Sequence, residues 1–83
     1  MPTFYTYALY SKVHNKIYIG FTSNLEGRLL YHNQFATKGF TIKFRPWEII
    51  FSETFPTKED AMKREKQLKS ANGRLFIRSL IST

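Results

Sequence analysis

The stretch that decides the fold is FYTYALYSKVHNKIYIGFT, residues 4–22. Phe4 to Lys12 and Lys16 to Thr22 are both rich in Tyr, Phe, Ile and Thr, residue types that favour strands. The trio Val13-His14-Asn15 separates them and contains a turn-forming Asn. The pattern predicts a β-hairpin. His14 falls in its turn, where we expect a solvated side chain without a role.

A helix is predicted directly after the hairpin. Ser23 is followed three residues later by Glu26, which is the spacing of a capping box. Apolar residues then recur at helical spacing, at Leu25, Leu29 and Ala36. We therefore expect a helix over 24–35.

The next segment, Thr37 to Arg45, contains Gly39 and basic but no acidic residues, and it predicts an exposed loop. Pro46 restricts Arg45 to extended geometry. A third strand follows, with one apolar face, because apolar residues alternate with Glu48, Ile50 and Ser52. The residues of that face are Trp47, Ile49 and Phe51.

Thr57 and the acidic residues after it predict the start of a second helix, which we expect Gly73 to end in a left-handed C′ conformation. The tail from Arg74 to Ile81 is apolar on one side and fits either a final helix or an edge strand. The predicted class is α+β, with a small three-stranded antiparallel sheet flanked by helices in the order β-β-α-β-α-α. At 83 residues, one domain over 1–83 is expected.

The composition excludes several classes of function and favours others. Thirteen Lys and Arg against six Asp and Glu give a formal charge of +7, which favours a polyanionic partner such as nucleic acid. The absence of cysteine excludes a thiol nucleophile and a Cys-based zinc site, and two histidines cannot build a zinc centre alone. No membrane span or signal peptide is visible, so we expect a cytoplasmic location.

Polar side chains fall on the apolar faces of both helices. Glu65 shares a narrow sector with Ala61, Leu68 and Asn72 on the second helix. A buried carboxylate needs a cation, a metal, a water-filled cleft or a raised pKa, and a neighbouring Lys is one such partner.

Arg28 and His32, at i and i+4, flank the apolar stripe of the first helix, and an Arg there needs an anion, either Glu65 or a phosphate. On the hairpin, Tyr5 and Tyr7 share a face. Tyr18 joins it if Val13 pairs with Lys16.

Together these residues resemble the GIY-YIG nuclease family, in particular its small stand-alone members. Tyr5-Thr6-Tyr7 corresponds to the first motif, ten residues separate Tyr7 from Tyr18, and Tyr18-Ile19-Gly20 is the second motif intact. Arg28 and Glu65 follow in the family's order. Phe21 departs from the DNA-repair members that carry a lysine there, and Asn72 is a possible equivalent of an Asn found in some restriction enzymes.

The resemblance implies a Mg²⁺-dependent endonuclease that nicks DNA and leaves a 5′-phosphate. Because no base-reading motif is visible, we expect structure rather than sequence to select the substrate. Tyr18 or Tyr7 would accept the proton of the attacking water, and Arg28 would hold the phosphate. His32 would contact that phosphate or orient a tyrosine. Glu65 would hold one hydrated Mg²⁺, which Mn²⁺ can replace.

Backbone contacts are expected from the basic segments, and no base-reading motif is visible. The residues assigned to these contacts are Lys38, Lys43, Arg45, Lys66 and Lys69. The alternative is a non-catalytic nucleic-acid-binding module with the same fold, and a protein partner for targeting stays open.

Overall fold

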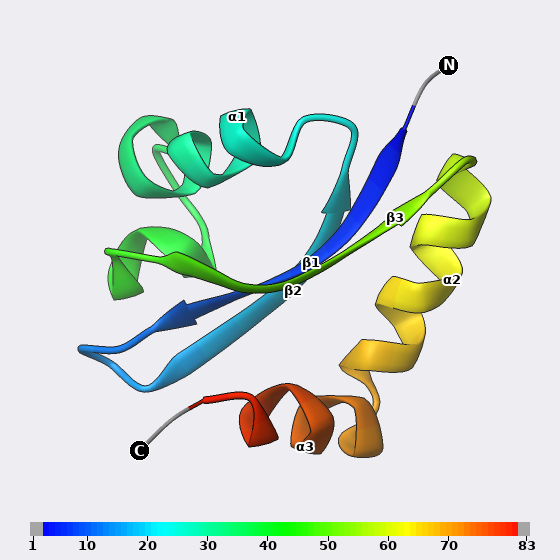
Figure 1. Cartoon of the computed structure of the whole chain (residues 1–83). Helices are drawn as coiled ribbons and strands as arrows, with labels where there is room; N and C mark the ends of the chain where they lie inside the picture. The colour runs from blue at the N-terminus through cyan, green and yellow to red at the C-terminus, as the bar shows by residue number, and fades with distance from the viewer. Residues whose placement is uncertain (1–2, 82–83) are drawn as a thin grey trace.

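The structure of the chain, a computed structural model, describes residues 3–81. Its elements are β1 (Phe4–Ser11), β2 (Lys16–Thr22), α1 (Leu25–Leu30), the π-helical turn η1 (Tyr31–Phe35), the 3-10 turn η2 (Phe40–Phe44), β3 (Glu48–Phe55), α2 (Lys58–Lys69) and α3 (Ala71–Ser79). Helices flank both faces of the sheet, α2 and α3 on one and α1 with the two turns on the other (Figure 1). The predicted α+β class is confirmed, and the tail forms a helix rather than an edge strand. Within the described residues, no helix is both long and apolar enough to cross a bilayer.

The three strands are antiparallel in the order β2-β1-β3. In the hairpin Tyr7 pairs with Gly20 and Ser11 pairs with Lys16, whereas the shared face of Tyr7 and Tyr18 was argued from a pairing of Val13 with Lys16. The two pairings differ by two residues, and side chains alternate with a period of two, so each residue keeps its predicted face. Tyr18 therefore lies on the face of Tyr7, as predicted.

The third strand contains a bulge that the sequence pattern did not predict. Ala8 pairs with Phe51 and Leu9 with Ile49, which leaves Ile50 without a partner of its own. On the two sides of the bulge, the alternation of side chains between the faces of the sheet differs by one residue. Ile49 packs with Trp47, whereas Phe51 packs against the α2 and α3 side, so the expectation that these three share one face was wrong for Phe51.

The second helical region also differs from its prediction at its end. Thr57 caps α2 as expected, since its side chain accepts a hydrogen bond from the Asp60 amide (3.2 Å). However, α2 ends at Lys69, and Gly73 lies inside α3 without positive φ. Gly73 is needed for a different reason: a Cβ there would collide with the Gln67 carbonyl oxygen and the Leu68 backbone. The glycine thus allows α3 to turn tightly against α2.

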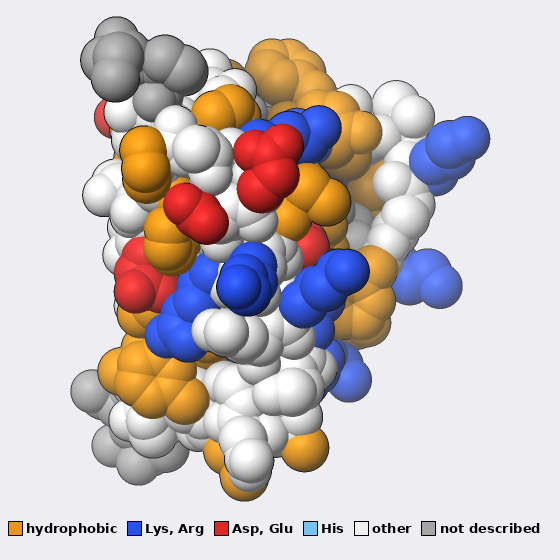
Figure 2. Space-filling model, turned by 90° about the vertical axis from the view of Figure 1, so that its right-hand side faces the viewer, with side chains coloured by type: hydrophobic (Ala, Val, Ile, Leu, Met, Phe, Trp, Pro, Cys, Tyr) orange, Lys and Arg blue, Asp and Glu red, His pale blue; other side chains and the backbone are white. Residues whose placement is uncertain are grey.

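Figure 2 views the molecule from the side of α2, where acidic side chains gather over the upper end and Lys and Arg over the middle. This follows the sequence of α2, which has Glu59 and Asp60 in its first turn and Lys66 and Lys69 in its last. Both placements complement the helix dipole.

The sheet separates two apolar clusters. The first, between the sheet and α2 and α3, consists of Ala8, Ile17, Ile19, Leu68 and Ile77. The second, facing α1 and the two turns, consists of Tyr7, Leu9 and Trp47, with Tyr18, Leu25, Leu29, Phe44 and Ile49 packed around them.

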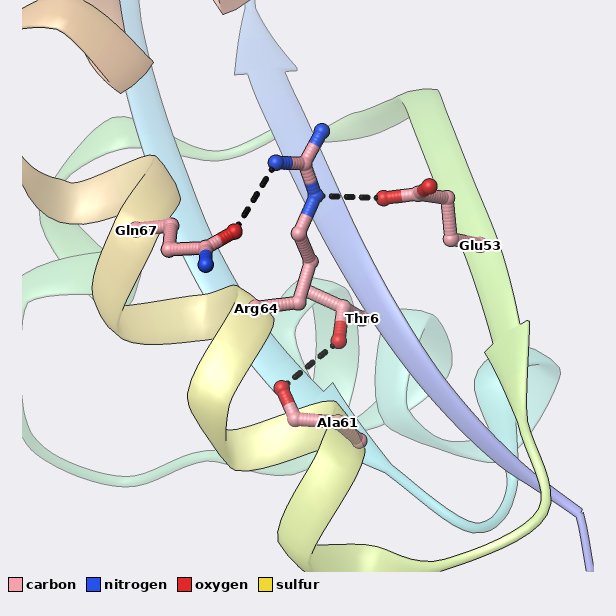
Figure 3. Close-up of polar contacts among 5 residues, drawn as sticks. All are labelled: Thr6, Glu53, Ala61, Arg64 and Gln67. Atoms are coloured by element: carbon pink, nitrogen blue, oxygen red, sulfur yellow. Dashed lines mark hydrogen bonds and ion pairs between the residues drawn. The ribbon is translucent and has the colours of Figure 1, made fainter.

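Polar contacts also hold α2 on the sheet. The buried Thr6 hydroxyl donates to the Ala61 carbonyl (2.8 Å), and Arg64 lies between Glu53 of β3 and Gln67 (Figure 3). The Arg64 Nε to Glu53 Oε1 distance is 2.6 Å. These contacts link α2 to β1 and β3.

The segment after the hairpin departs from its prediction twice. The N-cap of α1 is Asn24, whose Oδ1 accepts from the Gly27 amide (3.1 Å), so the capping box of Ser23 and Glu26 was wrong. Residues 37–45 are not an open loop, because η2 forms within them and buries Thr41.

Candidate active site

The hairpin brings two phenols together over a glycine. Tyr7 from β1 is almost fully buried, and its ring centroid lies 6.4 Å from that of Tyr18 on β2. A Cβ at Gly20 would lie 2.7 Å from the Tyr7 hydroxyl oxygen and 3.3 Å from Cε2 of Tyr18. Only a residue without a side chain lets the Tyr7 hydroxyl occupy this position.

His32 reaches the same point from η1. The helix predicted over 24–35 is interrupted, since its last turn is a π-helix, a form that is often found at functional sites. His32 is buried there while Arg28 stays exposed, although both were expected to flank one stripe. The His32 Nε2 lies 3.3 Å from the Tyr7 hydroxyl, and its ring centroid lies 4.8 Å from that of Tyr18.

Thr41 of η2 holds the other side of the imidazole. Its Oγ1 lies 3.0 Å from His32 Nδ1, and its carbonyl accepts a hydrogen bond from the Trp47 indole (2.8 Å). Trp47 is itself held by Asn33, which exchanges two hydrogen bonds with the Trp47 backbone. The imidazole is thus fixed at both nitrogens.

The electrostatics of the site keep both Tyr7 and His32 uncharged. Burial, Arg28 and Arg45 lower the pKa of His32, which keeps the imidazole neutral at pH 7. Burial, with Tyr18 and Glu65, raises the pKa of Tyr7 above its usual range, and Arg28 only partly opposes this. Tyr7 is therefore a neutral phenol beside a neutral imidazole. One ring nitrogen of His32 donates and the other accepts: either Tyr7 donates to Nε2 and Nδ1–H donates to Thr41, or Nε2–H donates to Tyr7 and the Thr41 hydroxyl donates to Nδ1.

Arg28 supplies an available guanidinium at the rim. It lies on the exposed side of α1, with its Cζ 5.5 Å from the centre of the Tyr31 ring. Within residues 3–81 no hydrogen bond or ion pair engages its nitrogens. Its charge acts on both Tyr7 and His32. This geometry suits the capture of an anion from solvent.

Glu65 is the carboxylate that the sequence assigned to the site. Its side chain is only 17% exposed and lies 3.2 Å from the Nζ of Lys69, one turn further along α2. Its charge also raises the pKa of Tyr7, as the smallest contribution after burial, Tyr18 and Arg28. One of the options given by the sequence is thus observed: Glu65 pairs with a neighbouring Lys.

No group of three or more acidic or His side chains that could hold a metal occurs within the described part of the chain. Glu65 is a single carboxylate, and Mg²⁺ is commonly bound through one or two carboxylates while it keeps several waters. The donor set of the site therefore fits one hydrated Mg²⁺.

Sequence reasoning missed Thr41, because the basic residues around it indicated a solvated loop. The segment does carry an apolar residue at every second position, at Phe40, Ile42 and Phe44, but this alternation puts Thr41 on the opposite side and gives no signal for its burial. Such alternation is atypical of an exposed loop and favours a segment with one buried side.

The expected nucleic-acid contacts divide into two groups. Lys38, Lys43, Lys66 and Lys69 are exposed. Arg45 is half-buried, and its guanidinium donates to the carbonyls of His32 (2.5 Å) and Ala36 (2.8 Å), so the structure gives it an internal role instead.

Asn72 is exposed on α3 and does not share a helix face with Glu65, contrary to the predicted single helix.

Comparisons with known proteins identify the family of this chain. The family model described as the GIY-YIG catalytic domain matches residues 3–77. The UPF0213 protein SH2523 of Staphylococcus haemolyticus is 34% identical over 70 residues, which cover 84% of each chain. UPF0213 protein YazA of Bacillus subtilis is 40% identical over 55 residues, or 66% of this chain and 56% of that protein.

A solved structure shares the fold. The solution NMR structure of the UPF0213 protein BH0048 from Bacillus halodurans superposes with a TM-score of 0.55 at 27% identity, covering 94% of this chain and 84% of that one. With the family model matching nearly the whole chain, this protein belongs to the GIY-YIG family and carries its nuclease-type fold.

Proposed function

We propose that this protein is a Mg²⁺-dependent endonuclease that hydrolyses DNA phosphodiester bonds. The observation that carries the proposal is the meeting of Tyr7, Tyr18 and His32 over Gly20, with the charges of Arg28 and Glu65 acting on the Tyr7 hydroxyl. Phosphodiester hydrolysis needs a base for water, positive charge against the transition state and support for the leaving oxygen.

Arg28 is assigned to the scissile phosphate. Its planar guanidinium can hold two phosphate oxygens at once, and no internal partner within residues 3–81 competes for it. The charge that accumulates on these oxygens during attack strengthens the contact in the transition state.

Tyr18 is assigned as the base that accepts a proton from the attacking water. Tyr7 suits this role less, because its raised pKa keeps its proton in place. Tyr7 and His32 instead orient the groups around them. Tyr18 is less buried than Tyr7 and lines a surface hollow, which suits access of the attacking water.

Glu65 would hold the Mg²⁺, with Mn²⁺ as a possible replacement. When bound, the metal would neutralise charge on the phosphate and on the departing oxygen. Lys69, which now pairs with Glu65, would then be available for a backbone phosphate.

Exposed lysines would bind the DNA backbone without reading its sequence, at Lys38, Lys43, Lys66 and Lys69. We therefore propose that the shape of the DNA selects the substrate. The absence of cysteine favours a reducing compartment, and we propose the cytoplasm as its location.

The test is nicking of supercoiled, branched and single-stranded DNA with and without Mg²⁺. We expect Glu65→Gln and Tyr18→Phe to reduce the rate at least about a hundredfold, the effect of removing one transition-state stabiliser. Glu59→Gln removes an exposed carboxylate of the same helix and should cut as the wild type does. Absence of cleavage, or cleavage that survives both site substitutions, would refute the proposal.

A second candidate function is a non-catalytic nucleic-acid-binding module. The observation that favours it is the Glu65–Lys69 ion pair, which satisfies the carboxylate without a metal. It predicts salt-dependent DNA binding that Glu65→Gln leaves unchanged, together with no turnover.

A further inference from the structure

A hollow of about 270 Å³ beside the proposed active site combines aromatic surface with positive charge. Its lining consists of Ile17, Tyr18, Ile19, Phe40, Lys69 and Arg74. Phe40 is 48% exposed, although a Phe is ordinarily buried. The core does not account for this exposed ring at the mouth of the site.

Three aromatic rings pack around Phe40. Its centroid lies 4.8 Å from that of Phe44 and 6.1 Å from that of Trp47. It is also nearly parallel to the Tyr18 ring, at an interplanar angle of 24° and a centroid distance of 6.5 Å. Phe40 thus presents a flat, supported face next to the phenol that we assign as the base.

The opposite wall of the hollow is cationic. Lys69 and Arg74 are both exposed, and Lys69 pairs with Glu65, which is not part of the lining. Within residues 3–81, no hydrogen bond or ion pair engages the Arg74 guanidinium. A ligand with a flat neutral ring and an attached anion matches both walls.

We propose that this hollow binds an unpaired nucleobase of the DNA substrate, stacked on Phe40, with a flanking phosphate held by Arg74. In a duplex both faces of each base are covered by its neighbours, whereas a base in a single-stranded segment or at a strand end leaves a face free. The substrate class is therefore DNA with an unpaired nucleotide beside the scissile bond. The link to cleavage rests on the proposed function, but the binding site does not.

Binding of an oligothymidylate with one central 2-aminopurine, measured in EDTA by anisotropy and by 2-aminopurine emission, tests the site without cleavage. Stacking quenches this emission, so the wild type should bind the strand and quench it. Phe40→Ala should weaken binding roughly 5- to 150-fold, the range expected from the loss of one base–aromatic stack, and abolish the quenching. Phe40→Leu keeps an apolar side chain against Phe44 and Trp47 and should show the same loss, while Phe40→Trp should retain binding.

Phe35→Ala is the matched control, because Phe35 is 62% exposed and lies outside the hollow. It should bind like the wild type. Arg74→Gln should reduce the salt dependence of binding by about 0.7 in the log–log slope, as one lost phosphate contact to a single strand does.

Three results would overturn the assignment: equal binding by wild type, Phe40→Ala and Phe40→Leu, an equal loss with Phe35→Ala, or blunt duplex bound as tightly as the single strand. A protein that binds through Phe40 but never cuts would support this site while refuting the proposed nuclease. A protein that cuts DNA without any dependence on Phe40 would support the proposed nuclease and refute this binding site.

Discussion

Replacing Gly20 by Ala is the sharpest perturbation of the site. The added Cβ would lie 2.7 Å from the Tyr7 hydroxyl oxygen and 2.9 Å from its Cζ, whereas ordinary contacts begin near 3.4 Å. The end of the Tyr7 ring must therefore move by about 0.7 Å. Because the Tyr7–His32 contact is already 3.3 Å long, a displacement of this size is enough to break it.

The ring is 2% exposed and cannot swing into solvent, so we expect a loss of about 1–3 kcal/mol in the free energy of unfolding, as for other overpacked sites. For a chain of this size, each kcal/mol lowers the unfolding midpoint by about 4–8 °C. The rate of DNA nicking should fall by about 10²-fold, the effect of a misplacement near 1 Å in an active site.

Thermal unfolding followed by circular dichroism measures the loss of stability. Plasmid nicking at a temperature well below the unfolding midpoint measures the loss of activity. Gly73→Ala is the control, because its Cβ would collide with backbone between α2 and α3, away from Tyr7. It should lower the midpoint without changing the nicking rate of the folded protein. If Gly20→Ala unfolds and cuts like the wild type, the reasoning about Tyr7 is refuted.

Three further predictions concern other parts of the molecule. The pKa of His32 is lower in the folded than in the unfolded chain, so stability is fully present above about pH 6.5 and is lost as the pH falls from there through the folded pKa. Unfolding midpoints between pH 8 and pH 5 should follow this trend, and His32→Gln should flatten it, whereas the exposed His14→Gln should not. Thr41→Val removes the hydroxyl that bonds His32 Nδ1, so we expect a change in the imidazole ¹⁵N shifts and a loss of about 1–3 kcal/mol, while Thr41→Ser restores both. Unchanged shifts in Thr41→Val would contradict the hydrogen bond between Thr41 and His32. Thr57→Ala removes the N-cap of α2 and should lower stability by about 1 kcal/mol in urea unfolding with nicking intact, and an unchanged midpoint would argue against the cap.

The hairpin was predictable because its information is local. Alternation places Tyr7 and Tyr18 on one face, and an error of two residues in the pairing does not change that face. The bulge at Ile50 was not predictable in the same way, since it arises where β3 pairs with a strand about forty residues earlier. Phe51 moved to the other cluster as a result.

The helix ends and the segment around Thr41 were also not predictable from local sequence. Asn24 and Ser23 are both good caps, and the path of the chain leaving β2 selects between them. The burial of Thr41 depends on His32 and Trp47, which approach it from different elements. The sequence marks Arg45 as a surface cation, but in the fold its guanidinium donates to the carbonyls of His32 and Ala36, at and just after η1.

Residue order alone was sufficient for the class of fold, the shared face of the tyrosines and the presence of a carboxylate among apolar neighbours, because each follows from a period of two or of 3.6 residues. Which tyrosine keeps its proton, which cation stays available and where the imidazole points were decided only in three dimensions. Burial and charge act through space, and the groups that set them are distant along the chain.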